Sequence, residues 1–88
     1  MKLIISILLK GKEGKGRKHV KKTFDTNIIP SKDCKIEDLA WKKEREIVNI
    51  IINYSENYCM VELSPDEDNY DLEEKLKMYL NHSWEKLA

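Results

Sequence analysis

"EIVNIIINYSENYCMVEL", residues 46–63, is the stretch of sequence that decides the fold. Its first part, "IVNIIINY", holds five β-branched residues in eight, which disfavours a helix and favours a strand. A helix is the alternative, because apolar residues over 36–54 also recur at helical spacing. The short "SEN" leads into a second alternating run, in which Cys59, Val61 and Leu63 share one face. We therefore predict a β-hairpin made of strands 46–54 and 58–63.

The N-terminal third predicts a second, longer hairpin. Residues 2–10 place apolar side chains on both faces, so both faces of that strand should be at least partly covered. Glycines in "GKEGKG", residues 11–16, allow the backbone reversal of the loop. In the returning strand, 18–29, apolar and polar residues alternate, and Pro30 should end it because proline lacks an amide donor.

The C-terminal quarter predicts an amphipathic helix over about 70–87. Leu72, Leu76, Tyr79 and Leu80 recur at helical spacing, and the acidic first turn suits the positive end of the helix dipole. One of three residues should cap this helix, namely Asp66, Asp68 or Asn69. The segment 36–46 is compatible with helix or loop. The fold class is α+β: one domain, 1–88, with a strongly twisted antiparallel sheet or partly open barrel of four to five strands over about 2–63.

Composition and charge narrow the class of protein further. The chain has 88 residues, of which 41% are hydrophobic and 36% charged, so it should fold as one globular domain. The apolar run at the start is too short for a membrane span and lacks a signal-peptide cleavage site, which favours a cytoplasmic protein. Residues 1–45 carry a formal charge of +7 and residues 46–88 carry −7, and self-pairing of the two halves is the simplest consequence.

The sequence offers no clear catalytic or metal-binding constellation. Cys34 and Cys59 lack a framing motif, and we expect both thiols to be reduced and structural. The two cysteines and two histidines lack the close paired spacing of a zinc site. The acidic stretch 62–74 has neither the glycine nor the distal glutamate of a calcium-binding loop. We therefore expect no cofactor, no metal and no enzymatic activity.

The order of short motifs resembles a group of small proteins. The strand, the glycine-bearing basic loop, "NIIP", "KDCKIED", the isolated Trp41, "EIVNIIINY" and "YCMVEL" together resemble small uncharacterised proteins of phages and prophages in low-GC Gram-positive bacteria, over about residues 1–65. The resemblance implies a small, strongly bent sheet or barrel of the Src-homology-3-like kind. It also implies an accessory role, directed at a host protein or defence system.

Two groups of residues are candidates for binding. The aromatic residues exceed what one small core easily buries, and aromatic side chains are common anchors in interfaces, so a protein partner could bind at Trp41, Tyr54, Tyr58 and Trp84. The alternative is that Trp41 closes the end of the barrel and Trp84 packs the helix onto the sheet. The basic loop could contact the phosphates of a nucleic acid nonspecifically through Lys12, Lys15, Arg17, Lys18, Lys21 and Lys22.

The function we predict is protein binding by a non-enzymatic accessory protein that forms a homo-oligomer, such as a dimer. Strands with two apolar faces favour self-association, because one helix covers only one face of a sheet. Nonspecific nucleic-acid binding by the basic hairpin, residues 10–22, is the alternative.

Overall fold

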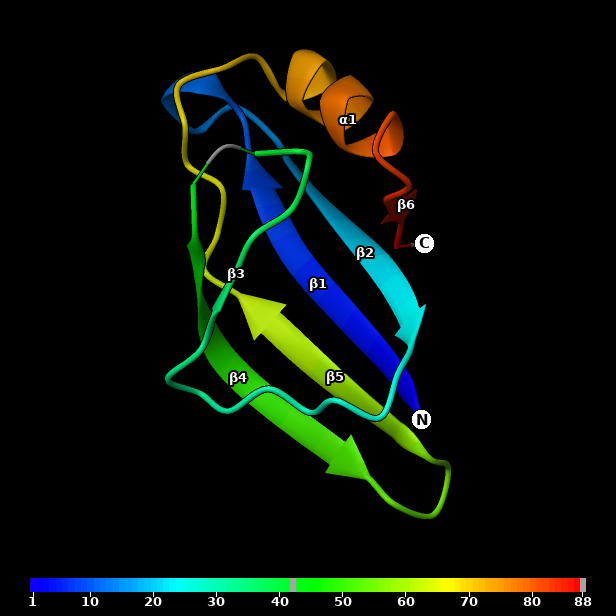
Figure 1. The fold of residues 1–88 in the computed structure, drawn as a ribbon. Coiled ribbons are helices and arrows are strands. Elements are labelled where there is room, and N and C mark those ends of the chain that lie inside the picture. The colour runs from blue at the N-terminus through cyan, green and yellow to red at the C-terminus, as the bar shows by residue number, and fades with distance from the viewer. Residues whose placement is uncertain (42, 88) are drawn as a thin grey trace.

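The computed structural model describes residues 1–41 and 43–87 and shows a sheet with one helix (Figure 1). The longer strands are β1 (Lys2–Lys10), β2 (Arg17–Asp25), β4 (Arg45–Asn53) and β5 (Tyr58–Leu63), and two short strands are β3 (Lys35–Ile36) and β6 (Glu85–Lys86). A single 3-10 turn, η1 (Lys12–Gly14), lies between β1 and β2, and α1 (Leu72–Leu80) follows the sheet. The α+β class predicted from the sequence is confirmed.

The strands form one curled, open sheet, a half-barrel, in the order β3-β4-β5-β1-β2-β6. The described residues thus contain six strands, and the prediction of four to five was wrong because two-residue strands leave no readable pattern. The sheet is also mixed, since β1 and β5 pair in parallel. The reason is visible in Figure 1: the long connection 26–44 carries the chain back across the sheet before β4 begins, so that β5 runs in the direction of β1.

The hairpin of β1 and β2 turns where the glycines predict. Gly14 and Gly16 have φ values of 74° and 84°, which residues with a side chain rarely adopt because of steric hindrance from the Cβ atom. A Cβ on Gly11 would lie 1.8 Å from the carbonyl oxygen of Lys15, so this position needs glycine for close backbone approach. A Cβ on Gly16 would lie 2.9 Å from the Leu72 side chain, which shows that the loop packs against the start of α1.

The hairpin of β4 and β5 is confirmed: β5 has the predicted bounds, and β4 begins and ends one residue earlier than predicted. Ile50 pairs with Val61 and Ile52 with Cys59, and a bulge interrupts the register between Ile47 and Asn49. Asn57 closes the turn with a φ of 58°, a conformation that asparagine tolerates better than most residues.

The C-terminal helix is shorter than the predicted 70–87. α1 ends at Leu80, Ser83 adopts a φ of 70°, and the chain then forms β6 against β2. In the sequence, Trp84 and Leu87 happen to continue the helical spacing of apolar residues, which is why the predicted helix was longer. In the structure, the left-handed conformation of Ser83 and the pairing of β6 with β2 prevent the helix from continuing. The predicted caps were also wrong, since Asp71 occupies the N-cap position.

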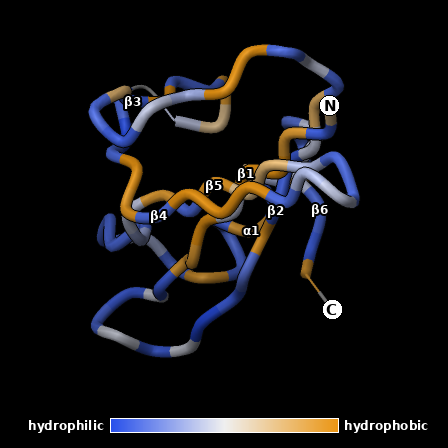
Figure 2. Tube along the Cα trace, turned by 90° about the horizontal axis from the view of Figure 1, so that it is seen from below, coloured by the Kyte–Doolittle hydropathy of each residue, from blue (hydrophilic) through white to orange (hydrophobic). Residues whose placement is uncertain are grey.

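The inner face of the half-barrel carries the core. β1 directs Ile5, Ile7 and Leu9 to this face, where α1, the connection 26–44 and the C-terminal segment cover them. β2 ends at Asp25, four residues before the predicted end, because the chain leaves the sheet there to form the connection. In Figure 2, hydrophobic residues lie along the strands, and the connection 26–44 stands apart from the sheet on one side of it.

None of the helices in residues 1–41 and 43–87 has the length and hydropathy needed to cross a membrane.

Candidate functional site

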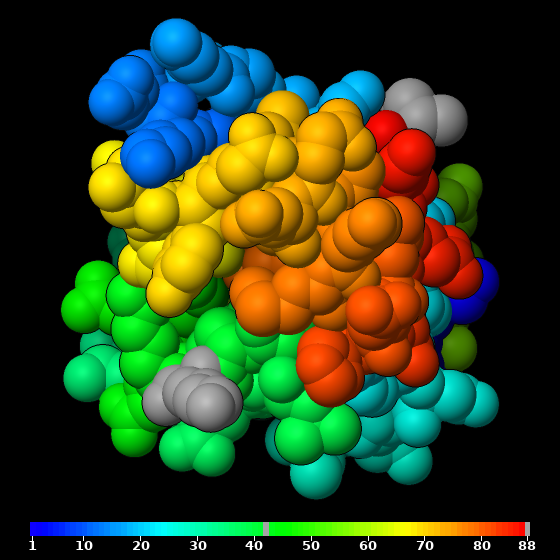
Figure 3. All heavy atoms as spheres, turned by 90° about the horizontal axis from the view of Figure 1, so that it is seen from above, coloured from blue at the N-terminus to red at the C-terminus, as the bar shows by residue number. Residues whose placement is uncertain are grey.

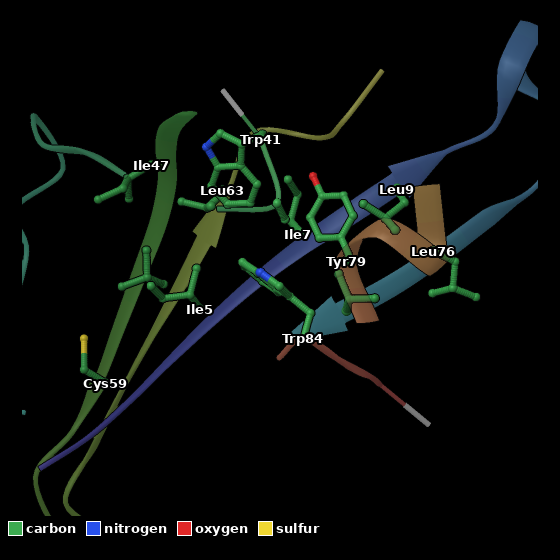
Figure 4. Close-up of a cluster of buried hydrophobic side chains, with 13 residues drawn as sticks. Ile5, Ile7, Leu9, Trp41, Ile47, Cys59, Leu63, Leu76, Tyr79 and Trp84 are labelled. Carbon is green, nitrogen blue, oxygen red and sulfur yellow. The ribbon is translucent and has the colours of Figure 1, made fainter. Parts of the chain in front are cut away.

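Three aromatic rings meet under the cover of the inner face (Figure 4). The Trp41 and Tyr79 ring centroids are 5.8 Å apart, and Trp84 lies 5.5 Å from each of the other two. These spacings are typical of favourable tilted and edge-to-face aromatic contacts. The rings come from the long connection, from α1 and from the segment after α1, so the cluster joins all three covering elements to one another.

A buried carboxylate lies beside this aromatic cluster. Asp66 is 1% exposed, and its Oδ2 accepts a hydrogen bond of 2.7 Å from the Tyr79 hydroxyl. The same oxygen lies 3.2 Å from Arg45 Nη2, and Asp66 Oδ1 lies 3.2 Å from Lys75 Nζ. We call Asp66, Arg45, Lys75 and Tyr79 the Asp66 cluster. Burial, reinforced by the bond to Asp66, raises the pKa of the Tyr79 hydroxyl, which therefore stays protonated and donates.

The two cations of the Asp66 cluster are bound differently. Lys75 is 1% exposed, and its ammonium also donates to the backbone carbonyls of Lys10, at 2.6 Å, and Asp66, at 3.0 Å, so all three of its donors are used. Arg45 lies with its guanidinium 5.2 Å from the Trp41 ring centroid, while its buried Nε–H has no acceptor among the described residues. The carboxylate therefore links β4, the segment after β5 and α1, and Lys75 extends this link to β1 through the carbonyl of Lys10.

The sequence contained a signal for this cluster that our prediction missed. Lys75 lies three residues after Leu72 and four before Tyr79, so it shares the apolar stripe of α1. A charged residue on a buried stripe requires a buried partner of opposite charge. The pairing with Asp66 could not be read from spacing, because Asp66 lies in a loop whose direction only the tertiary structure sets.

A second polar contact fixes the long connection to the inner face. Asp38 receives hydrogen bonds from Lys22 Nζ, at 2.8 Å, and from the Trp84 indole N–H, at 3.0 Å. Burial alone would raise the pKa of the Asp38 carboxyl. These two donors, the backbone N–H of Ala40 and the charge of Lys22 together outweigh burial and hold the pKa below its ordinary value. Lys22, which the prediction assigned to nucleic-acid binding, is thus engaged inside the fold.

Two depressions flank Trp41. One, of about 630 Å³, is lined by three members of the Asp66 cluster and by residues around them, namely Arg45, Asp66, Lys75, Asp68, Tyr70 and Met78. The other, of about 920 Å³, lies between Phe24 and the strand β3. Lysine and arginine residues lining the first depression are balanced by aspartate and glutamate residues, several of them in ion pairs with one another. The geometry therefore gives the first depression no preference for an anion or a cation.

The outer face of the sheet, opposite to the core, carries an apolar row across three strands. Ile4 of β1 pairs with Met60 of β5, which pairs with Ile51 of β4. Tyr58 lies on the same face two residues before Met60, and Ile51 is 50% exposed. We call Ile4, Ile51, Tyr58 and Met60 the outer apolar row. The described helix and long connection contribute their buried side chains to the core on the inner side, so this row faces outward.

The predicted partner-binding residues occupy different environments. Trp41 and Trp84 are 7% and 3% exposed and form the aromatic cluster, which agrees with the alternative considered for them. Tyr54 is 78% exposed at the end of β4, and Tyr58 is half-buried in the outer apolar row. Of the four, only the two tyrosines therefore present a substantial surface to a partner.

The basic residues of the first hairpin do not form a single stripe. Because side chains alternate along β2, Arg17 and Lys21 point to the outer face and Lys18 and Lys22 to the inner face. Lys12 and Lys15 are exposed in the loop between the strands. The view from above in Figure 3 shows this hairpin loop projecting at the rim, beside the helix and the segment that precedes it. The positive charges of the hairpin loop are therefore accessible, but those of the hairpin as a whole are distributed over both faces of the sheet and the loop.

The cysteines do not contribute to a site with the histidines. Burial raises the pKa of the Cys59 thiol in the core, whereas hydrogen bonds from Ser31 lower the pKa of the exposed Cys34 thiol. Residues 1–41 and 43–87 contain no group of three or more potential metal-ligating side chains placed to share an ion. Comparison of the chain with protein-family models, curated proteins and solved structures finds no match.

Proposed function

We propose that this chain is a non-enzymatic accessory protein that acts by binding proteins, including a second copy of itself. The observation that carries the proposal is the outer apolar row, in which Ile4, Met60 and Ile51 adjoin across three hydrogen-bonded strands on the face of the sheet opposite to the core. A soluble domain with a contiguous apolar surface on one face of its sheet tends to use it for binding. The resemblance to phage and prophage proteins adds that the second partner is a host protein in the cytoplasm.

The distribution of apolar and charged residues on the outer face supports a protein as the partner, in preference to a lipid surface or to exposure of this face to solvent. On the outer face of β4 and β5, Ile51, Met60 and Tyr58 form an apolar centre. Polar and charged residues surround this centre, namely Asn49, Asn53 and Glu62 on β4 and β5, and Arg17 and Lys21 on β2. An apolar centre with a charged rim is the usual anatomy of a protein interface. Tyr58 adds an aromatic anchor at the edge of the row, a residue type enriched among interface hot spots.

The test is analytical ultracentrifugation of the purified protein across a concentration series, with Met60→Lys as the disrupting variant. Met60 lies at the centre of the row and is only half-buried, so lysine should be tolerated in the monomer. Thr23→Lys is the matched control, because Thr23 pairs with Ile4 on the same face but lies outside the row. We expect Met60→Lys to weaken association at least about tenfold, the equivalent of about 1.4 kcal/mol, and Thr23→Lys to leave it unchanged.

A partner captured from a low-GC Gram-positive host would then be purified and titrated against the same variants. Equal binding by the wild type and Met60→Lys, in both assays, would remove the support for the outer apolar row.

Nonspecific nucleic-acid binding is the second candidate, favoured by four residues at the hairpin that form no ion pair within the described part of the chain, namely Lys12, Lys15, Arg17 and Lys18. Fluorescence-anisotropy titration of labelled DNA and RNA tests it. Micromolar binding with a steep salt dependence, lost on reversing the charges of Lys15, Arg17 and Lys18, would favour this function. Absence of binding at low salt would leave these lysines as protection of the strand edge.

A further inference from the structure

The two edges of the half-barrel differ in how they are protected. On one side, β2 carries lysines at Lys18, Lys21 and Lys22, and β6 pairs with its middle. Charged side chains and short covering strands are the usual means by which proteins prevent pairing at a sheet edge. This edge is therefore protected against pairing with a further strand.

The opposite edge, β4, lacks this protection. β3 pairs with β4 only at Arg45 and Glu46. Along the edge of β4 that faces away from β5, no strand of the described chain therefore pairs with residues 47–53. This segment, "IVNIIIN", contains no charged residue, no proline and no glycine. Ile51 and Ile52 are 50% and 38% exposed. An uncharged, β-branched and unpaired edge of this length is a template for a further strand.

We propose that two copies of this chain pair through β4, antiparallel and about a two-fold axis, in the register that places Ile51 opposite Ile51 of the second copy. This inference rests on the self-association included in the proposed function and assigns it to one element.

The sequence of β4 is self-complementary in this register. The segment "NIIIN", residues 49–53, reads the same in both directions, so Asn49 lies opposite Asn53 and Ile50 opposite Ile52 of the second copy. A two-fold interface requires this kind of match, because each side supplies the same surface. The neutral strands meet without like-charge repulsion, whereas two lysine-bearing β2 edges would repel one another.

The surrounding structure fits the length of this pairing. The paired segment extends from Val48 to Tyr54, between β3 at one end and the turn at the other, and stops before the charged Glu46 and Glu56. It also joins the two outer apolar rows into one, since Ile51 is the outermost member of each row. The dimer interface and the apolar surface are therefore continuous.

Disulfide trapping tests the register in a Cys34→Ser background, which removes the exposed native thiol. Ile51→Cys should form a covalent dimer on mild oxidation, because directly opposite residues have Cα atoms about 4.5 to 5.5 Å apart, within the range of a disulfide. Asn49→Cys alone should not, since its two copies would be about 14 Å apart along the strands. A mixture of Asn49→Cys and Asn53→Cys should form the mixed dimer. Dominant trapping of Ile50→Cys would overturn the register.

Amide hydrogen exchange gives a readout of the backbone itself. Alternate residues of β4 direct their N–H groups away from β5, and these amides should exchange at least about tenfold more slowly at high than at low protein concentration. Self-association without this protection and without trapping at Ile51 would overturn the pairing of β4 and leave the outer apolar row as the contact. A chain that stays monomeric up to millimolar concentration would overturn both the pairing and the self-association proposed above.

Discussion

Asp66 is the residue on which the polar contacts of the fold converge. Its carboxylate accepts from Tyr79, Arg45 and Lys75, and one oxygen also accepts from the backbone N–H of Asp68 at 3.0 Å. Tyr79 and Lys75 come from α1 and Arg45 from β4, whereas Asp68 lies two residues after Asp66 itself. A buried carboxylate is tolerated only where opposite charges and donors compensate for its lost hydration, and here both are present.

Asp66→Asn should destabilise the protein by about 3 to 5 kcal/mol, because it leaves the buried Lys75 and Arg45 without their anion. Glu67→Gln is the control, since the Glu67 side chain is exposed and its ion pair with Lys10 should contribute less than about 1 kcal/mol. Urea unfolding followed by tryptophan fluorescence measures both, because Trp41 and Trp84 are buried. Equal stabilities of the two variants would contradict a structural role for the buried carboxylate.

At the scale of the element, the end of α1 shows how one backbone conformation redirects the chain. The helix ends at Leu80, and Ser83 takes a φ of 70°, after which β6 pairs with β2 and Trp84 enters the aromatic cluster. A left-handed serine is strained, because its Cβ approaches the following carbonyl oxygen. This short segment is therefore held in place by packing on either side of it.

Ser83→Gly should raise the free energy of unfolding by about 0.5 to 1 kcal/mol, since glycine adopts a positive φ without this strain. The corresponding increase in thermal midpoint is about 2 to 8 °C for a domain of this size. Ser83→Val, which adds β-branching at the same position, should lower the midpoint. A thermal midpoint of Ser83→Val above that of the wild type would show that residue 83 does not adopt the left-handed conformation.

Several features of the elements could be predicted from the sequence. β-Branching in 46–54 identified β4, and alternation identified β5, because strand patterns are local. The glycines located the loop between β1 and β2 for the same reason. The helix end, β3 and β6 could not be predicted, since each depends on a neighbour distant in the sequence.

At the scale of the whole molecule, charge pairing joins the two halves that the sequence distinguishes. Ion pairs link Lys10 to Glu67, Lys43 to Asp68 and Arg45 to Asp66, each connecting the basic first half to the acidic second half. These pairs agree with self-pairing of the two halves, the simplest consequence of the charge distribution along the sequence. The carboxylates involved tie the loops to the sheet, so their protonation affects the assembly of the whole fold.

Acid should therefore destabilise the protein, in part through Asp38. Burial raises the pKa of Asp38, but hydrogen bonds from Lys22, Trp84 and the Ala40 backbone, together with the charge of Lys22, outweigh burial and lower the pKa in the folded state. The unfolded chain then binds more protons at low pH, so stability is lost as the pH falls below about 4, the ordinary aspartate pKa, toward the lower folded value. Urea unfolding between pH 7 and pH 2.5 should show this loss.

Asp38→Asn should be less stable than the wild type at pH 7. The difference in their free energies of unfolding should narrow as the pH falls, because protonation of Asp38 in the wild type removes the same charged interaction with Lys22. Lys22→Met, which takes away the cationic donor, should show the same narrowing. A constant difference across the whole range would contradict a role for the Asp38 carboxylate in the pH dependence.

The sequence by itself determined the hairpins, the presence of a terminal helix, the α+β class and the opposite charges of the two halves, because these follow from local periodicity and composition. The tertiary structure alone decided the parallel pairing of β1 with β5, the burial of Trp41 and Trp84, and the convergence of Arg45 and Lys75 on Asp66. These features depend on how the connection 26–44 and the segment 64–71 turn back over the sheet. Such paths are set by the packing of distant residues against one another, which no local pattern encodes.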